Sequence, residues 1–249
     1  MTDLAKLSWP EVKTLVEGGC AAILPVGSTE AHGPHLPLDT DVTIALGTAR
    51  RAAAALEASG RACVVLPPVA YAVTDYAGEF AGTVGISSHS AVMLLQDVLM
   101  GALRAGFRPV AVANGHLEPA HLDTVRAAIA NILALQGDEV LFPDVTRRFL
   151  AQRLTDEFKS GACHAGSYES SLVMADDPDA VKDDVRQALP PVDISLVDAI
   201  RAGRDTFLKA GGTQAYFGRP ADATAAEGHA TYDVLASMLV EAIEGAQAG

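Results

Sequence analysis

Short apolar runs alternate along the chain with longer amphipathic stretches. Four of the runs predict buried strands, at residues 20–26, 62–69, 109–113 and, more weakly, 139–142. Three stretches between them carry apolar residues at helical spacing with glycine at or just past their ends, at residues 42–58, 88–105 and 122–135. Near-continuous apolar strands separated by helices are typical of a mainly parallel sheet covered on both faces.

The remainder of the chain adds one helix and one long connection to this α/β pattern. Residues 221–246 predict a final helix packed on the outside, and the Pro- and Asp-rich segment 178–192 predicts a connecting loop. The chain contains no internal repeat and no low-complexity tract. We therefore expect a single domain over residues 1–249.

Composition narrows the class of protein. Hydrophobic residues make up 49% of the chain, which is too many for a disordered protein. No uncharged apolar stretch reaches the roughly 18 residues that a membrane span needs. Residues 1–10 are mixed polar and contain no basic-then-apolar signal, so we expect a cytoplasmic protein without a membrane partner.

The charge balance disfavours nucleic acid as a partner. Eighteen Lys and Arg residues against 31 Asp and Glu residues give a net charge of −13. The only adjacent basic pairs are Arg50-Arg51 and Arg147-Arg148, so no concentrated basic surface is expected.

The three cysteines offer neither a disulfide framework nor a thiolate zinc site. Cys20, Cys63 and Cys163 are odd in number, far apart and without a C-x-x-C motif. We interpret them as small buried hydrophobic residues.

Polar clusters follow the predicted strands, where a parallel sheet places its ligands. They occupy residues 27–35 with 39–41, residues 114–118, and residues 163–171. Five of the seven histidines lie within or directly beside these clusters, and only His89 and His229 lie elsewhere.

The spacing within two of the clusters predicts a metal site. Residues i and i+2 of an extended chain point the same way, so Glu30 should converge with His32, and His116 with Glu118. Asp41, at the start of the following helix, can add a carboxylate between two ions. Imidazole with carboxylate suits zinc or manganese. About three negative charges would balance two divalent ions and a bridging hydroxide.

Structural alternatives stay open for these residues. Glu30 could belong to a capping box, although Gly33-Pro34 would break a helix there. Asp41 could instead interact favourably with the dipole of the following helix from its first turn. Asp39 or Thr40 is expected to cap this helix. The other histidines have alternatives as loop, helix-start or surface residues, namely His35, His121, His89 and His229.

The third cluster lacks the i, i+2 convergence. A neutral His164 beside a metal site could carry a proton to a leaving nitrogen, with Glu169 orienting the ring. The alternative is a loop histidine followed by a helix whose first turn holds Glu169. The neighbouring clusters favour the functional interpretation.

Taken together, these segments resemble the creatininase (creatinine amidohydrolase) family. The resemblance runs in the family's order from about residue 20 to residue 171 and rests on residues 24–38 (LPVGSTEAHGPHLPL), Thr40-Asp41, Phe80-Ala81-Gly82-Thr83, Asn114-Gly115-His116, His164-Ala165-Gly166 and Glu169-Ser170. The first of these segments is long and highly specific.

The resemblance implies roles for individual residues. The positions that match the family's metal ligands are Glu30, His32, Asp41 in the bridging place, His116 and, as in the creatininases proper, Glu118. His164 matches the catalytic histidine, and Glu169 matches a carboxylate near the centre. Glu118 is also a candidate catalytic residue.

The resemblance also implies a fold and a chemistry. It implies a three-layer α/β/α fold with a mainly parallel sheet, two divalent ions (zinc, manganese or iron), hydrolysis of a C–N amide bond and a homo-oligomer, often a hexamer. Within this frame the sequence predicts an amidohydrolase for a small cyclic or formyl-type amide. The alternatives are a peptide-trimming metallopeptidase and a catalytically silent metal-binding scaffold.

Departures from the creatininases concern the substrate pocket. Leu117 replaces an aromatic residue, Pro119 an asparagine and Ala81 a proline, and residues 159–162 (KSGA) lack a Trp-Asp pair. These differences predict a changed specificity. The segment 74–80 is the predicted variable pocket loop, and the candidate substrate contacts are Thr74, Tyr76 and Leu117.

Overall fold

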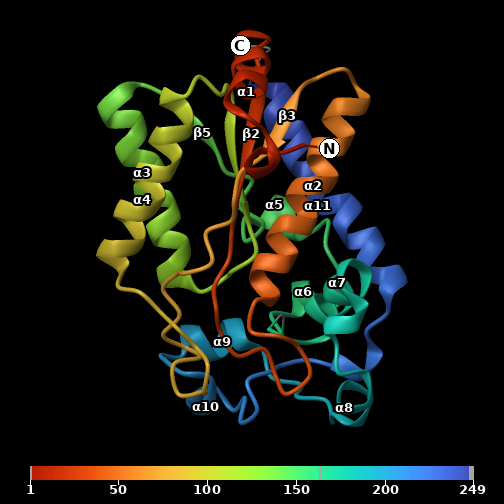
Figure 1. Cartoon of the computed structure of the whole chain (residues 1–249). Helices are drawn as coiled ribbons and strands as arrows, with labels where there is room; N and C mark the ends of the chain where they lie inside the picture. The colour runs from red at the N-terminus through yellow and green to blue at the C-terminus, as the bar shows by residue number, and fades with distance from the viewer. Residues whose placement is uncertain (1, 163, 247–249) are drawn as a thin grey trace.

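A five-stranded parallel sheet forms the centre of the molecule (Figure 1). The computed structural model describes residues 2–162 and 164–246, so Cys163 lies outside the described residues. The strand order is β1-β3-β2-β4-β5, and every pairing is parallel. The strands are β1 Thr2–Asp3, β2 Ala21–Val26, β3 Cys63–Val65, β4 Val110–Asn114 and β5 Val140–Leu141.

Helices cover both faces of this sheet (Figure 1). The α-helices are α1 Trp9–Glu17, α2 Thr40–Ala58, α3 Ser88–Arg104, α4 Pro119–Gln136, α5 Arg148–Ala151, α6 Asp156–Ser160, α7 Ser167–Asp176, α8 Asp183–Ala188, α9 Leu196–Arg201, α10 Phe207–Ala210 and α11 Ala225–Gly245. Short 3₁₀ turns lie at Leu4–Lys6, Pro178–Ala180 and Pro220–Asp222. The predicted three-layer α/β/α fold is confirmed.

The central strand explains why both faces are buried. In β2, Ala22 and Leu24 face the core formed with α3 and α4, whereas Ala21 and Ile23 face the core formed with α2 and α11. On the second face, α2 packs through alanines against the alanines of β4. Such small side chains let the helix backbone lie close to the sheet, which places the start of α2 beside the ends of β2 and β4.

Three element predictions need correction, the third of them the final helix described below. The strand predicted at 62–69 ends at Val65, because Pro67 and Pro68 cannot donate to a ladder, and Val69 makes only an isolated bridge to Val26. The predicted loop 178–192 contains the 3₁₀ turn Pro178–Ala180 and α8, which is anchored by the buried Arg186.

Arg186 holds α8 in place from its last turn. Its side chain donates to the carbonyls of Pro220 and Ala221, at 2.7 and 3.0 Å. These contacts are distant in sequence, which is why composition alone pointed to a loop.

The final helix begins later than predicted. Residues Pro220–Asp222 form a 3₁₀ turn, and the Thr224 side chain then caps α11 by accepting the Glu227 N–H at 3.1 Å. The helix forms part of the outer layer and packs against α2 and α7.

The described cysteines agree with the sequence prediction. Cys20 and Cys63 are buried free thiols, as predicted. Among the described residues, no helix combines the length and apolar character that crossing a membrane requires.

Candidate metal centre

Two glycines bring the start of α2 against the ends of β2 and β4. A Cβ atom on Gly27 would lie 2.5 Å from the backbone nitrogen of Val42, and one on Gly115 would lie 2.1 Å from the carbonyl oxygen of Asp41. Only glycine leaves room for this approach. The backbone of Asp41 is therefore held at the edge of the sheet from two sides.

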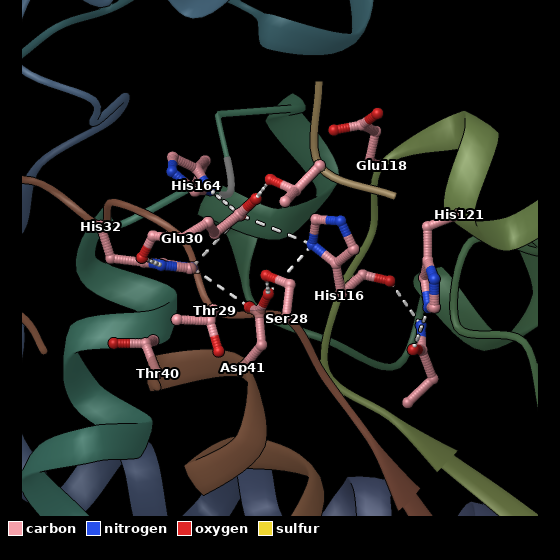
Figure 2. Close-up of polar contacts among 12 residues, drawn as sticks. Ser28, Thr29, Glu30, His32, Thr40, Asp41, His116, Glu118, His121 and His164 are labelled. Carbon is pink, nitrogen blue, oxygen red and sulfur yellow. Dashed lines mark hydrogen bonds and ion pairs between the residues drawn. The ribbon is translucent and has the colours of Figure 1, made fainter. Parts of the chain in front are cut away.

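The Asp41 carboxylate lies between two histidines (Figure 2). Its Oδ1 is 3.1 Å from His32 Nε2, and its Oδ2 is 2.9 Å from His116 Nδ1. The Ser28 hydroxyl donates to Oδ2 at 2.7 Å and fixes the rotamer. Each oxygen thus faces a different imidazole, which is the arrangement that a bridging carboxylate needs.

Three overlapping groups of side chains could each hold a metal ion. They are Glu30 with Asp41 and His116, His32 with Asp41 and Glu169, and Glu30 with His32 and His164. Within each group the ligand atoms lie within 4.8 Å of one another, and all the residues are buried. The first two groups share only Asp41, so together they describe two neighbouring positions with one common ligand.

The histidine nitrogens show that the centre fits a metal. His116 directs Nε2 to the Val73 carbonyl at 2.8 Å, which leaves Nδ1 facing the carboxylates. His32 directs Nδ1 to the Glu30 carbonyl at 3.2 Å, and its buried Nε2 has no hydrogen-bond partner among the described residues. Proteins orient histidine ligands in this way. One ring nitrogen donates a hydrogen bond, and the other keeps its lone pair for the metal.

Burial and neighbouring charges shift the pKa values of the side chains at the centre in opposite directions. Burial alone would raise the pKa of Glu30, but the His116 and His164 rings lower it to about 2. Burial would lower the pKa of His32, but the Asp41 and Glu169 carboxylates outweigh the effect of burial and raise the pKa to about 10. Burial raises the pKa of Glu169 to about 8. Clustered buried carboxylates need nearby positive charge, which divalent cations can supply.

The segment Val73–Tyr76, here called the strap, makes hydrogen bonds to the side chains of His116 and Glu30. Besides the Val73 carbonyl, the strap provides the Thr74 hydroxyl, which donates to Glu30 Oε2. Thr74 is only 2% exposed, so the structure places this predicted substrate contact behind Glu30. Its position is that of a group that orients a metal ligand.

Glu118 is held by the same strap. Its carboxylate accepts the N–H groups of Asp75 and Tyr76 at 3.1 and 3.2 Å, and it lies apart from the three ligand groups (Figure 2). Burial raises the pKa of Glu118 to about 7. The structure therefore brings Glu169, and not Glu118, together with His32 and Asp41.

His164 lies beside the ligand cluster with one nitrogen free to exchange a proton. Its Nε2 is 3.0 Å from the Ala31 carbonyl, and its Nδ1 is 3.8 Å from Glu30 Oε1. Its ring centroid lies 4.4 Å from that of His32 and 4.2 Å from that of Phe207. Nothing in the local sequence around Phe207 pointed to this contact.

Glu169 is oriented by the turn before its own helix. It lies in the first turn of α7, and its Oε2 accepts the Ala165 N–H at 2.6 Å while lying 3.5 Å from His32 Nε2. Its side chain is buried, so it faces the centre and not the solvent.

The other histidines lie outside the three ligand groups. His35 is fully buried with Nε2 at 2.8 Å from the Ser170 hydroxyl, so the alternative of an exposed loop residue is wrong. His121 is in the first turn of α4, with Nε2 at 2.8 Å from Asn114 Oδ1, as predicted. His89 and His229 are exposed, also as predicted.

A cavity of about 940 Å³ opens from the centre. Glu30, Asp41, His116, His164 and Glu169 line its inner end, and Tyr76, Leu117 and Glu118 line it further out. Its remaining walls come from α4, α5, α6, α9 and Phe207. The sequence motifs gave no indication of the part played by α5, α6 and α9.

Comparisons with known proteins show the family of this chain. The family model of creatinine amidohydrolases (creatininases) matches residues 5–243. A mycofactocin precursor peptide peptidase of Mycolicibacterium smegmatis is 34% identical over 209 residues, covering 83% of this chain and 77% of the relative. The creatinine amidohydrolase of Pseudomonas putida is 26% identical over 219 residues, covering 80% of this chain and 82% of the relative.

Solved structures share the fold along the whole chain. A creatinine amidohydrolase superposes with a TM-score of 0.74 at 24% identity, covering 97% of this chain and 96% of the other. A manganese creatininase gives the same TM-score at 23% identity, with 98% of both chains covered. Since the family model spans nearly the full length and the resemblance of the motifs agrees with it, the chain belongs to the creatininase family.

Proposed function

We propose that this protein is a metal-dependent hydrolase that cleaves an amide bond of a peptide at the centre around Asp41. The observation that carries the proposal is the pair of ligand groups that share this one carboxylate. In the proposal, Glu30, Asp41 and His116 hold one ion, and His32, Asp41 and Glu169 hold the other. When bound, two divalent cations polarise a carbonyl and make water reactive at neutral pH.

His164 moves the proton in this proposal. Hydrolysis forms a bond between the water oxygen and the carbonyl carbon, breaks the C–N bond and places a proton on the leaving nitrogen. Because His164 Nε2 donates to the Ala31 carbonyl, Nδ1 carries the lone pair that faces the centre. Nδ1 can therefore accept a proton from the attacking water and pass it to the nitrogen.

The size of the cavity favours a peptide as the substrate. About 940 Å³ is at the upper end of the range for small-molecule sites, and the walls extend from the centre across α5, α6 and α9. The relative from M. smegmatis, named as a peptide peptidase, supports the same class. The sequence alone instead favours a small cyclic or formyl-type amide.

A small cyclic or formyl-type amide is the second candidate. It is favoured by the His164 and Phe207 rings, which lie 4.2 Å apart on the cavity wall beside the ligands. The relative from P. putida, named as a creatinine amidohydrolase, supports this class.

A substrate panel with a His164→Asn variant tests the proposal. We expect the metal-loaded protein to hydrolyse short peptides faster than creatinine or N-formyl amines. The variant should keep its metal but lose on the order of 10²–10⁴-fold in kcat, because only proton transfer is removed. The matched control is His229→Asn, which changes an exposed histidine and should match the parent protein.

Three results would count against this function. Faster hydrolysis of creatinine or formyl amides than of every peptide would favour the second candidate. Metal-loaded protein that hydrolyses none of the compounds would favour the silent scaffold. Full activity of His164→Asn would remove this residue from the proton-transfer step.

A further inference from the structure

The cavity has cationic side chains on its outer walls, although the protein carries a net charge of −13. Four cationic residues line it beyond the metal centre, namely Arg126, Arg148, Lys159 and Arg201. In the part of the chain that the structure describes, the acidic residues on its walls apart from Glu118 and the centre are Asp123 and Asp198. Beyond the centre, the cavity wall thus holds four cationic side chains against three acidic ones, counting Glu118 among the described residues.

Three of these cations have carboxylate partners. Arg126 contacts the buried Asp144 at 2.6 Å. Lys159 contacts Asp156 at 2.7 Å, and Arg201 contacts its neighbour Asp198 at 3.2 Å. Their charge is largely compensated within the protein.

Arg148 differs from the other three. Across residues 2–162 and 164–246, its guanidinium makes no hydrogen bond and no ion pair, and the side chain lies on the wall of the cavity. A guanidinium presents donors in a planar fork that matches a carboxylate. Of the cations on the wall, Arg148 is therefore the one whose charge and donors are free for a ligand.

Much of the cavity wall is apolar. The apolar side chains that line the cavity include Leu117, Leu122, Phe158, Leu196 and Phe207. A ligand that extends from the ligand cluster to Arg148 would pass this surface. The walls suit a molecule with an amide at one end, an apolar middle and an anionic group further out.

From this arrangement we propose that the substrate is a peptide bearing a carboxylate, which Arg148 binds while the scissile amide lies at the metal centre. The proposal rests on the proposed peptide function and names the substrate class for the same site. The carboxylate can be the C-terminus of the peptide or the side chain of an Asp or Glu residue. Both sources present the same two oxygens to the guanidinium.

The test uses four sets of short peptides that share the same mixture of sequences and contain no other acidic residue. They carry a free C-terminal carboxylate or a C-terminal amide, each with or without one aspartate, and hydrolysis is followed by mass spectrometry. The metal-loaded parent protein should prefer carboxylate-bearing peptides over neutral ones by about tenfold in kcat/KM. Preference for free acids identifies the C-terminus, and preference for aspartate identifies the side chain.

Two variants connect the preference to one residue. Arg148→Gln should abolish the preference by raising KM for the charged peptides about tenfold. Arg147→Gln is the matched control, because Arg147 is the adjacent arginine, is paired with Asp144 at 3.4 Å and does not line the cavity. This control should keep the preference of the parent protein.

The outcomes separate the two proposals. Equal hydrolysis of neutral and charged peptides would overturn the role of Arg148 while leaving peptide hydrolysis intact. The same would follow if both variants kept the preference or if both lost it. Hydrolysis of formyl amides or creatinine with none of the peptides cleaved would instead overturn the peptide function, and the carboxylate proposal with it.

Discussion

Replacing Asp41 with asparagine should empty both metal positions at once. Each oxygen of this carboxylate faces a different histidine, at 3.1 Å for His32 and 2.9 Å for His116. Asparagine keeps the size of the side chain but removes the charge and one acceptor oxygen. Because metal activation contributes several kcal/mol to such hydrolyses, turnover should fall on the order of 10³-fold or more.

Elemental analysis together with thermal unfolding checks this expectation. A chelator should lower the melting temperature of the parent protein, since metal binds the folded state, but should leave that of Asp41→Asn unchanged. Asp39→Asn is the matched control, because Asp39 is exposed two residues earlier and its side chain makes no capping hydrogen bond in the described part of the chain. An Asp41→Asn protein that still holds two ions per chain would show that this residue is not the shared ligand.

Replacing Gly115 with alanine should disrupt the centre without touching any ligand side chain. The added Cβ would lie 2.1 Å from the Asp41 carbonyl oxygen, so either the start of α2 or the end of β4 must move. Overpacking of this kind costs about 3 kcal/mol in the free energy of unfolding. The displacement would also shift Asp41 relative to His116, so we expect metal content and turnover to fall together.

Gly101→Ala is the comparison that isolates the steric effect. A Cβ at Gly101, in α3, would meet no further atom of residues 2–162 and 164–246 within 4 Å, so this variant should be more stable by up to about 1 kcal/mol. Denaturant unfolding measures both changes. If Gly115→Ala kept the stability and the metal content of the parent protein, the close approach of α2 would not be what positions Asp41.

Much of the fold was predictable because its signals are local. Strands buried on both faces must be apolar throughout, and β2 and β4 were recognised on that basis. One error arose where a distant contact decided the structure. Arg186 anchors α8 through carbonyls more than 30 residues away, and no pattern within residues 178–192 encodes that contact.

The metal centre was predictable to the extent that ligands cluster along the chain. Glu30 and His32 converge as their spacing predicted, with 3.8 Å between Oε1 and Nε2. The same spacing did not show that the Glu118 carboxylate turns to the N–H groups of the strap. Phe207 and Arg148 reach the cavity through tertiary contacts, which spacing does not reveal. The homohexamer and the cytoplasmic location stay predictions.

The metal stoichiometry of the parent protein tests the central claim most directly. Protein purified without a chelator, then titrated with Zn²⁺ or Mn²⁺ in a calorimeter, should hold two ions per chain. Two ions are expected because two buried ligand groups meet at one carboxylate. Protein that contains no transition metal and binds neither ion would contradict the account.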